Sequence, residues 1–204
     1  MKSNIPVMSL QRLPVYLNYL KTLEKGGDKF ISSGAIAHAL NLGEVLVRKD
    51  LAYTSAQGRT RVGYVLSELI SALEDYLGCN DKKNAILIGA GELGYAILCY
   101  GGFKNYGIDL VAAYDNNPEK IGKSVSGKPI RDVLSLAEDV KKMEVKLAVI
   151  CVPAQYAQEV CDRLVASGVK AMLNFAPVIL QTPEGFSVIN MDVAANLAIL
   201  SSMI

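Results

Sequence analysis

A glycine-rich turn between a short apolar strand and a helix is the feature that most constrains the fold of this chain. The strand AILIGA runs into a GxGxxG sequence, Gly89-Ala90-Gly91-Glu92-Leu93-Gly94, and a helix pattern follows directly. The next apolar strand ends in Asp115, 21 residues after Gly94, close to the spacing of about 20 in dinucleotide-binding βαβ units. The pattern therefore predicts a Rossmann-type unit.

Each residue type in this turn has a physical reason. Gly89 permits the tight turn, Gly91 lets the backbone approach a pyrophosphate, and Gly94 allows close packing of helix on strand. The helix N-terminus presents N–H groups to the phosphates. Asp115 is expected to accept hydrogen bonds from the adenosine ribose and to repel a 2′-phosphate, which favours NAD(H) over NADP(H). The alternative is a glycine-rich turn that has lost its ligand.

Strands alternate with helices through the rest of this half, which predicts a parallel, doubly wound sheet. The expected strands are residues 109–115, 128–130, 146–152, 169–175 and 187–190, and the expected helices are 132–142 and 154–167. Ligands bind beyond the carboxyl ends of such strands. Val152 and Pro153 are therefore expected to border the cofactor; the alternative is an ordinary strand-to-helix turn with proline at the helix start.

The first third of the chain reads as four helices and a basic hairpin, the order of a winged helix-turn-helix. The first helix carries leucines at helical spacing and ends at Gly26–Gly27; Pro14 fits it only near the first turn. The others are expected at residues 33–40, 44–53 and 66–77, with a hairpin tip at 55–61 and a return strand at 62–65. We expect a DNA-binding domain at 1–80, a cofactor domain at 81–190 and a terminal helix at 191–204.

Charge is uneven along the chain. Residues 1–66 hold nine Lys/Arg and four Asp/Glu, a net +5, so the overall +1 leaves −4 for residues 67–204. Arg48 and Lys49 on the third helix are expected to contact phosphates or guanine edges in a major groove. Arg59 and Arg61 at the hairpin tip are expected to enter a minor groove. The alternative is a solvated surface with scattered charges.

Composition excludes several classes of protein. With 51% hydrophobic and 20% charged residues the chain is not disordered, and it contains no apolar run long enough to span a membrane. No signal peptide is expected from the N-terminal residues. Four widely spaced cysteines are typical of a reduced, cytoplasmic protein, and a single histidine, His38, argues against a metal site.

The C-terminal segment from Val193 to Ile204 contains no charged residue. A helix of this kind is expected either to pack in its own core or to be donated to a partner subunit. The cofactor half also lacks an evident acid–base pair, although Tyr100, Tyr106 and Tyr156 are present. We therefore expect a protein that binds a dinucleotide without enzymatic turnover.

Four motifs in this order resemble the bacterial redox-sensing repressor family Rex: Arg48-Lys49-Asp50-Leu51, Val62-Gly63-Tyr64, the GxGxxG turn, and Leu173-Asn174-Phe175-Ala176-Pro177. The resemblance covers essentially the whole chain. It implies a homodimer with a winged-helix domain, a Rossmann domain that senses NADH against NAD⁺, and a domain-swapped C-terminal helix. It further implies a transcriptional repressor that NADH releases from double-stranded operator DNA.

The resemblance also implies roles for individual residues. Tyr100 and Phe103 are expected near the nicotinamide, Asp192 at the start of the swapped helix, and Arg12 near the domain interface. The chain departs from the family pattern in four places: Leu46 replaces a glutamine, Tyr53-Thr54-Ser55 a Tyr-Phe-Gly, Thr60-Arg61 an Arg-Gly, and Asn18 an arginine.

Two other functions fit the same sequence. One is an NAD-dependent oxidoreductase with a fused helical domain. The other is a metabolite-sensing regulator whose Rossmann domain binds another nucleotide, such as a CoA derivative; the ribose contact expected of Asp115 favours NAD(H) instead.

Overall fold

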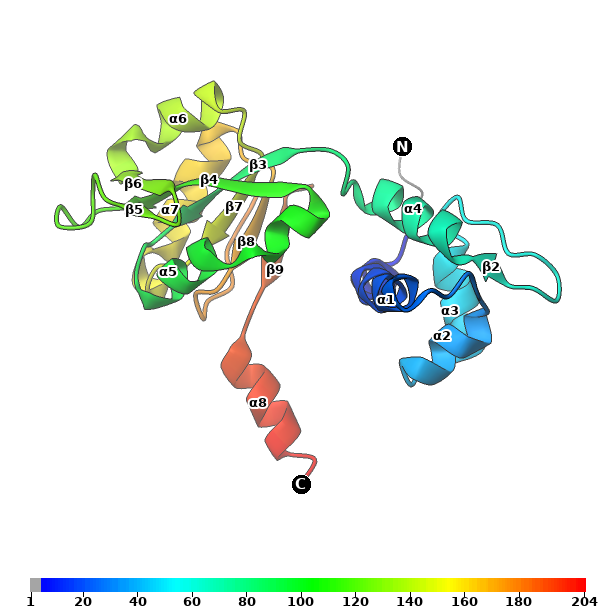
Figure 1. The fold of residues 1–204 in the computed structure, drawn as a ribbon. Coiled ribbons are helices and arrows are strands. Elements are labelled where there is room, and N and C mark those ends of the chain that lie inside the picture. The colour runs from blue at the N-terminus through cyan, green and yellow to red at the C-terminus, as the bar shows by residue number, and fades with distance from the viewer. Residues whose placement is uncertain (1–4) are drawn as a thin grey trace. The chain divides into compact units, whose positions relative to one another are not determined.

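The computed structural model describes residues 5–204, which form two compact units (Figure 1). One unit ends at Asp81 and the other runs from Lys82 to Ile204, so the division falls within the polar sequence of residues 79–84. We describe each unit by itself.

The N-terminal unit consists of helices around a small apolar core, with a two-stranded sheet at one side. Its elements are α1 (Val7–Gly26), β1 (Phe30–Ile31), α2 (Ser33–Ala39), α3 (Glu44–Leu51), β2 (Tyr64–Val65) and α4 (Leu66–Leu77). Leu13 and Leu17 of α1 are buried together with Val47 of α3 and Leu69 of α4. The element order is that of a winged helix-turn-helix, as the sequence predicts.

Two local expectations for this unit were wrong. Pro14 lies in the interior of α1, because the helix begins at Val7 and not beside the proline. Proline removes one helical hydrogen bond, but Leu13 and Leu17 on either side of it are completely buried, and their burial holds the helix together.

The return strand expected at residues 62–65 does not pair with the residues of the hairpin tip. Its last two residues form β2, which pairs antiparallel with β1, and Phe30 lies opposite Val65. The tip is closed by an isolated bridge between Arg59 and Gly63. Gly63 has a φ of +87°, and a Cβ there would collide with the carbonyl oxygen of Ile31, so glycine is required where the two segments cross.

The C-terminal unit is a seven-stranded sheet in the order β5-β6-β4-β3-β7-β8-β9, parallel except for β5. Its strands are β3 (Lys83–Ile88), β4 (Ile108–Asp115), β5 (Ser124–Val125), β6 (Lys128–Asp132), β7 (Leu147–Ile150), β8 (Ala171–Asn174) and β9 (Ser187–Asn190). Its helices are α5 (Glu92–Cys99), η1 (Gly101–Tyr106), η2 (Val133–Ser135), α6 (Leu136–Lys142), α7 (Ala154–Ser167) and α8 (Val193–Ser201). The predicted Rossmann-type sheet is confirmed.

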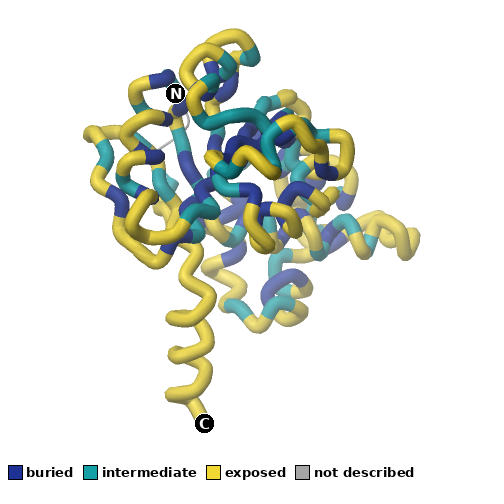
Figure 2. Tube along the Cα trace, turned by 90° about the vertical axis from the view of Figure 1, so that its left-hand side faces the viewer, coloured by how far each residue is buried: buried dark blue, intermediate teal, exposed yellow. Residues whose placement is uncertain are grey.

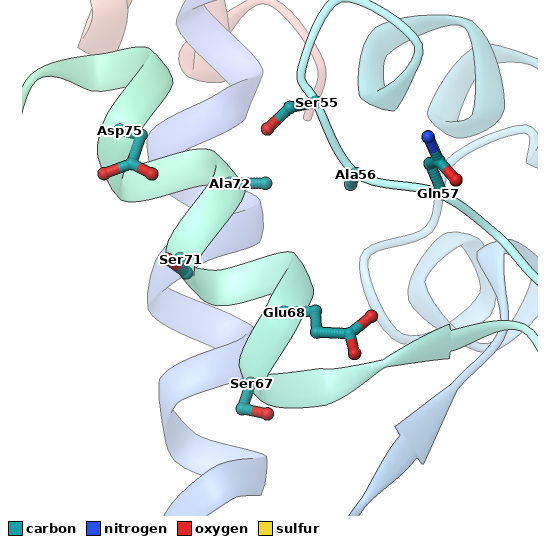
Figure 3. A pocket seen from close by; sticks show the side chains of 8 residues that line it. All are labelled: Ser55, Ala56, Gln57, Ser67, Glu68, Ser71, Ala72 and Asp75. Carbon is teal, nitrogen blue, oxygen red and sulfur yellow. The ribbon is translucent and has the colours of Figure 1, made fainter.

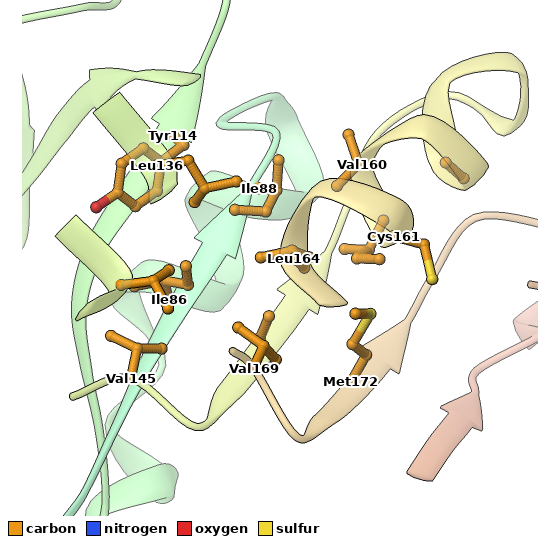
Figure 4. Packing of buried hydrophobic residues seen from close by; sticks show 14 of the residues in the cluster. Ile86, Ile88, Tyr114, Leu136, Val145, Val160, Cys161, Leu164, Val169 and Met172 are labelled. Atoms are coloured by element: carbon orange, nitrogen blue, oxygen red, sulfur yellow. The ribbon is translucent and has the colours of Figure 1, made fainter. Parts of the chain in front are cut away.

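Both faces of this sheet are buried, which explains the unbroken apolar strands. Ile86 and Ile88 of β3 pack with Leu164 of α7 on one face (Figure 4), while Leu87 packs with Leu98 of α5 on the other. Strand order reverses at β3, which has β4 on one side and β7 on the other. A ligand crevice is expected beyond the carboxyl ends of these strands.

Helix α8 does not pack against the core of its own unit. Every residue from 191 to 204 is exposed, as the yellow tube of Figure 2 shows. Leu197 and Leu200 are 62% and 60% exposed, and Asp192 caps the helix by accepting a hydrogen bond from the Ala195 N–H. Of the two expectations for this segment, packing in its own core was therefore wrong.

Asn174 ties the end of β8 to the segment that leads into α8. It is completely buried, and its Nδ2 lies 3.1 Å from the Ala176 carbonyl oxygen, 2.9 Å from that of Val178 and 2.9 Å from Asn190 Oδ1. The side-chain Oδ1 of Asn174 accepts the Ala176 N–H at 3.0 Å, and its backbone carbonyl oxygen accepts the Met191 N–H at 2.8 Å. The side chain therefore satisfies loop groups that would otherwise be buried without partners.

We expect the substitution Asn174→Ala to lower the free energy of unfolding by about 1–3 kcal/mol, because it leaves buried carbonyls unpaired. The matched control Asn190→Ala removes one hydrogen bond from an exposed residue and is expected to cost less, about 0.5–1.5 kcal/mol. Thermal or denaturant unfolding measures both, and equal losses would contradict a central role for Asn174.

Candidate functional site

A cavity of about 620 Å³ lies where the strand order reverses. The glycine turn after β3 contributes Gly89 and Gly91, the end of β4 contributes Asp115, and the turn between β7 and α7 contributes Val152 and Pro153. The structure thus brings together five of the expected cofactor residues. This is the crevice that the parallel topology predicts.

The three glycines of the turn differ in what surrounds them. Gly89 has a φ of +96°, and a Cβ there would lie 2.5 Å from the Cys151 carbonyl oxygen. A Cβ on Gly94 would collide with the Gly89 carbonyl oxygen. A Cβ on Gly91 would meet no protein atom within 4 Å among the described residues. Gly89 and Gly94 therefore serve the fold, whereas Gly91 keeps open a space that faces the cavity.

Helix α5 begins at this turn with an open N-terminus. Within residues 5–204 no side chain caps it, and Glu92 and Leu93 in its first turn are exposed. The Ala90 N–H is already donated to Asp115. The remaining N–H groups of the first turn and the helix dipole favour an anion at this position.

Asp115 is almost buried, at 9% exposure, and is held by three donors. Its carboxylate accepts the N–H groups of Ala90 and Asn117, both at 2.9 Å, and lies 3.2 Å from Lys120 Nζ. Burial alone would raise the pKa of Asp115, but these hydrogen bonds outweigh it and lower the pKa below the ordinary value. The group is therefore a carboxylate that joins the end of β4 to the glycine turn.

The sequence reasoning missed Lys120 and Asn117. Both line the cavity beside Asp115, and Lys120 is about one-third exposed. The available signal was the polar turn Asn116-Asn117-Pro118-Glu119-Lys120 that directly follows the strand. Its backbone folds back so that both an amide and an ammonium reach the carboxylate.

The remaining walls of the cavity are largely apolar. Val133 and Leu134 of η2 lie on one side, and Val160 of α7 contributes to the lining as well. Cys151 also lines the cavity, and burial raises the pKa of its thiol to about 12, so the thiol stays protonated and unreactive. Glu159 and Arg163 of α7 also line the cavity, so its wall combines apolar side chains with a few charged ones. Such a lining is typical of a ligand-binding crevice.

Tyr100 and Phe103 are not among the residues that line this cavity. They pack against each other at the end of α5 and in η1, with ring centroids 5.3 Å apart in an edge-to-face arrangement. Tyr100 is 63% exposed.

Helix α3 separates a buried face from an outward basic one. Val47, Asp50 and Leu51 are buried, whereas Arg48 and Lys49 are exposed. Val45 and Leu46 of the same helix are apolar, yet they are 60% and 37% exposed. Helical spacing therefore presents two cations and two apolar side chains to solvent, together with Glu44, whose Oε1 lies 3.5 Å from Arg48 Nη2.

The hairpin tip also presents its arginines to solvent. Arg59 lies 3.4 Å from Glu68 of α4, with both side chains about 60% exposed, and Arg61 is exposed at a φ of +65°. Behind the tip, a second cavity of about 510 Å³ lies between residues 55–57 and α4 and carries the carboxylates of Glu68 and Asp75 (Figure 3). Those carboxylates oppose an anionic ligand. We therefore take the cavity at the glycine turn, where the N-terminus of α5 is open, as the candidate cofactor site.

Arg12 forms a bidentate ion pair inside the N-terminal unit. Its Nε lies 2.6 Å from Asp50 Oδ2, and its Nη2 lies 2.8 Å from Asp50 Oδ1. The resemblance placed this arginine near a domain interface; within its own unit it binds the inner face of α3. The other expected interface residue, Asp192, caps α8.

In the described part of the chain no group of three or more His, Cys, Asp or Glu side chains is arranged to hold a metal ion. Among the helices of residues 5–204, none is both long and apolar enough to cross a membrane.

Comparison with known proteins gives full-length relatives. The redox-sensing transcriptional repressor Rex of Bacteroides fragilis is 37% identical over 97% of this chain and 90% of its own length. The proteins of the same name from Carboxydothermus hydrogenoformans and Treponema denticola are 40% and 38% identical, over 97% and 99% of this chain and 95% and 97% of their own lengths. The chain belongs to the Rex family of redox-sensing transcriptional repressors.

Family models and solved structures agree with this membership. Residues 4–52 match a model described as "Putative DNA-binding protein N-terminus", and residues 80–178 match one described as "CoA binding domain". A crystal structure of RSP in complex with β-NAD⁺ and operator DNA matches with a TM-score of 0.93 and 31% identity, over 99% of this chain and 93% of that chain. RSP in complex with β-NADH matches with a TM-score of 0.89, also at 31% identity, over 99% and 95%. The resemblance inferred from four motifs is thus confirmed.

The geometry of Asp115 predicts a cofactor preference. NADH should bind at least tenfold more tightly than NADPH, about 1.4 kcal/mol, because the carboxylate repels a 2′-phosphate. The substitution Asp115→Asn should narrow that ratio, whereas Lys120→Gln should widen it, since Lys120 partly neutralises the carboxylate. Calorimetric titration measures the affinities, and equal binding of both cofactors to the unaltered protein would contradict this role for Asp115.

Proposed function

We propose that this chain is an NADH/NAD⁺-responsive transcriptional repressor that binds operator DNA and is released from it when NADH binds. The observation that carries the proposal is an ionised Asp115 beside an open glycine turn, in a chain that also exposes Arg48 and Lys49 on helix α3. Family membership supports it, as do the complexes of RSP with β-NAD⁺ and operator DNA and with β-NADH.

We assign the cofactor to the cavity of the C-terminal unit. Gly91 and the first-turn N–H groups at Glu92 and Leu93 bind the pyrophosphate, and Asp115 accepts the adenosine ribose hydroxyls. Val152 and Pro153 border the bound dinucleotide. Tyr100 and Phe103 are assigned to the nicotinamide from the resemblance. A nicotinamide packed against these aromatic rings would lose contact with water, which favours the neutral reduced ring over the cationic oxidised ring.

We assign DNA reading to the outward face of α3 and to the hairpin tip. Arg48 and Lys49 bind phosphates or guanine edges in the major groove, and Arg59 and Arg61 reach a minor groove. The exposed side chains of Val45 and Leu46 lie on the same helix. In a major groove, apolar side chains of this kind contact the methyl groups of thymine. Because Leu46 stands in place of the family's glutamine, we expect a base preference of its own at that position.

The chain is proposed to bind its cofactor without turning over a substrate. Relatives are named as repressors, and two titratable groups of the cavity retain their protons: Cys151, whose pKa burial raises to about 12, and Tyr114, whose pKa is raised by burial and by its hydrogen bond to Asp139. A CoA derivative carries a 3′-phosphate on its ribose, which Asp115 would repel, so NAD(H) is the better ligand despite the name of the matching family model.

We propose that the functional unit is a homodimer in which α8 is exchanged between subunits. The cap at Asp192 supports a helix that forms before the second chain binds. The exposed apolar residues of α8 support its burial against that second chain. As a repressor it acts on the chromosome, which places it in the cytoplasm.

Electrophoretic mobility shift on the promoter region of the protein's own gene tests the proposal, with NADH and NAD⁺ titrated in parallel. NADH should dissolve the complex at concentrations where NAD⁺ leaves it intact. The proposal fails if the two cofactors act alike, and steady consumption of NADH with a small-molecule substrate would support the oxidoreductase alternative.

The two basic residues of α3 should differ in effect. Lys49→Ala should weaken binding to all sequences and reduce the salt slope by about one unit, whereas Arg48→Ala should cost about 1–3 kcal/mol and relax one base position. Fluorescence anisotropy at several salt concentrations measures both. Unchanged binding by both variants would exclude α3 as the reading helix.

Removal of residues 192–204 should abolish the stable dimer, because the exposed apolar surface of α8 contributes about 25 cal/mol per Å² when it is buried. Light scattering gives the mass of the truncated and full-length proteins. A folded, dimeric truncated protein would contradict the exchange of α8.

A further inference from the structure

The orientation of α3 about its own axis determines which side chains reach a DNA groove. Arg48 and Lys49 occupy the outward side, and Val47, Asp50 and Leu51 the inward side. Successive helical residues are separated by about 100°, so a rotation of one residue would replace Arg48 or Lys49 on the outward face by a neighbour.

Apolar contacts alone set this rotation only loosely. Val47 and Leu51 are completely buried, but hydrophobic burial has no preferred direction. The third inward residue, Asp50, is different, because its side chain is 1% exposed and charged. A charge at this depth requires partners with defined geometry.

Helix α1 supplies those partners. Arg12 binds both oxygens of Asp50, with Nε 2.6 Å from Oδ2 and Nη2 2.8 Å from Oδ1. The Tyr16 hydroxyl donates to Oδ2 at 2.7 Å, and Ser9 Oγ lies 3.2 Å from Arg12 Nη2. One side of α1 carries Ser9, Arg12 and Tyr16, which are spaced three and four residues apart. Arg12 and Tyr16 bind the Asp50 carboxylate directly, and Ser9 binds Arg12.

The electrostatics of the cluster match this geometry. Burial would raise the pKa of Asp50, but the hydrogen bonds from Arg12 and Tyr16 outweigh it and lower the pKa. Burial and the hydrogen bond to Asp50 raise the pKa of Tyr16 to about 12, so its hydroxyl stays a donor. All three groups therefore keep the charge states that the network needs near neutral pH.

We propose that Asp50, held by Arg12 and Tyr16, is a positioning residue that fixes the rotation and height of α3 and thereby the base specificity of Arg48 and Lys49. The inference rests on the proposed function, since it assigns a role within DNA reading. A planar guanidinium on both carboxylate oxygens allows one relative placement of two helices, which packing of valine and leucine does not. The network lies on the inward side of α3, opposite Arg48 and Lys49, so it would act through the placement of that helix.

Specificity and stability can be separated by variants of this pair. Single substitutions Asp50→Asn and Arg12→Gln each leave a buried partner unsatisfied, and both should lower stability as well as specificity. The double variant Arg12→Met/Asp50→Leu replaces the ion pair by apolar side chains of similar size, which is often neutral for stability. Because it leaves only the buried Tyr16 hydroxyl without its acceptor, it should fold with a melting temperature no lower than that of either single variant, yet lose the orientation of α3.

The experiment compares binding of the full-length protein to an operator duplex and to a scrambled duplex of the same length. We expect the double variant to lose at least tenfold in the ratio of the two affinities, while binding to the scrambled duplex and its salt slope stay unchanged. Tyr16→Phe, which removes one donor, should lose less. NADH affinity should remain that of the unaltered protein.

The matched control is Lys21→Gln/Glu74→Gln, which removes another ion pair of α1, one that reaches α4 instead of α3 at 2.6 Å. It should leave the affinity ratio unchanged. A double variant Arg12→Met/Asp50→Leu that keeps the full ratio would overturn the positioning role alone. An unaltered protein that does not distinguish the two duplexes would overturn the proposed function, and this role with it.

Discussion

The close approach of helix α5 to the end of β3 is the constraint on which the cofactor unit depends. The Cα of Gly94 lies against the Gly89 carbonyl oxygen, so that no side chain can be accommodated there. This contact holds the N-terminus of α5 at the mouth of the crevice, and Asp115 fastens the same turn to β4 through the Ala90 N–H. Gly91 faces open space as a result, and the dipole of α5 points to the position that we assign to the pyrophosphate.

Most of this unit could be predicted from the sequence, because its strands are buried on both faces and read as continuous apolar runs. The Asp115 position followed from spacing alone. Lys120 could not be found in this way, since its approach to Asp115 depends on how a polar turn folds back. The two-residue strand β5 was missed because it has too few residues to show a period, and β2 was paired with the wrong segment for the same reason.

The N-terminal unit was harder to predict for a different reason. Its order of helices is readable, but the contact that orders α3 joins residues 38 positions apart, Arg12 and Asp50, and a buried aspartate looks like a surface residue in a sequence. The exposure of Val45 and Leu46 could not be read from the sequence either, because apolar side chains look like core residues. Departures of this kind are expected at functional surfaces, where solubility is given up for recognition. The terminal helix α8 belongs to the same class, since its composition revealed that it needs a partner but not which surface covers it.

Coupling between the cofactor and DNA has a definite energetic requirement. A ligand shifts an equilibrium only by its differential affinity for the two states. Reversing a 99:1 preference requires about 5.5 kcal/mol, so two cofactors in a dimer would each supply about 2.7 kcal/mol, within the ordinary range of allosteric coupling. Linkage requires the effect to be reciprocal.

The most direct test is therefore calorimetric titration of NADH into the protein with and without its operator duplex. The account predicts that the duplex weakens NADH binding by the same factor by which NADH weakens DNA binding, and identical NADH affinities in the two titrations would contradict it.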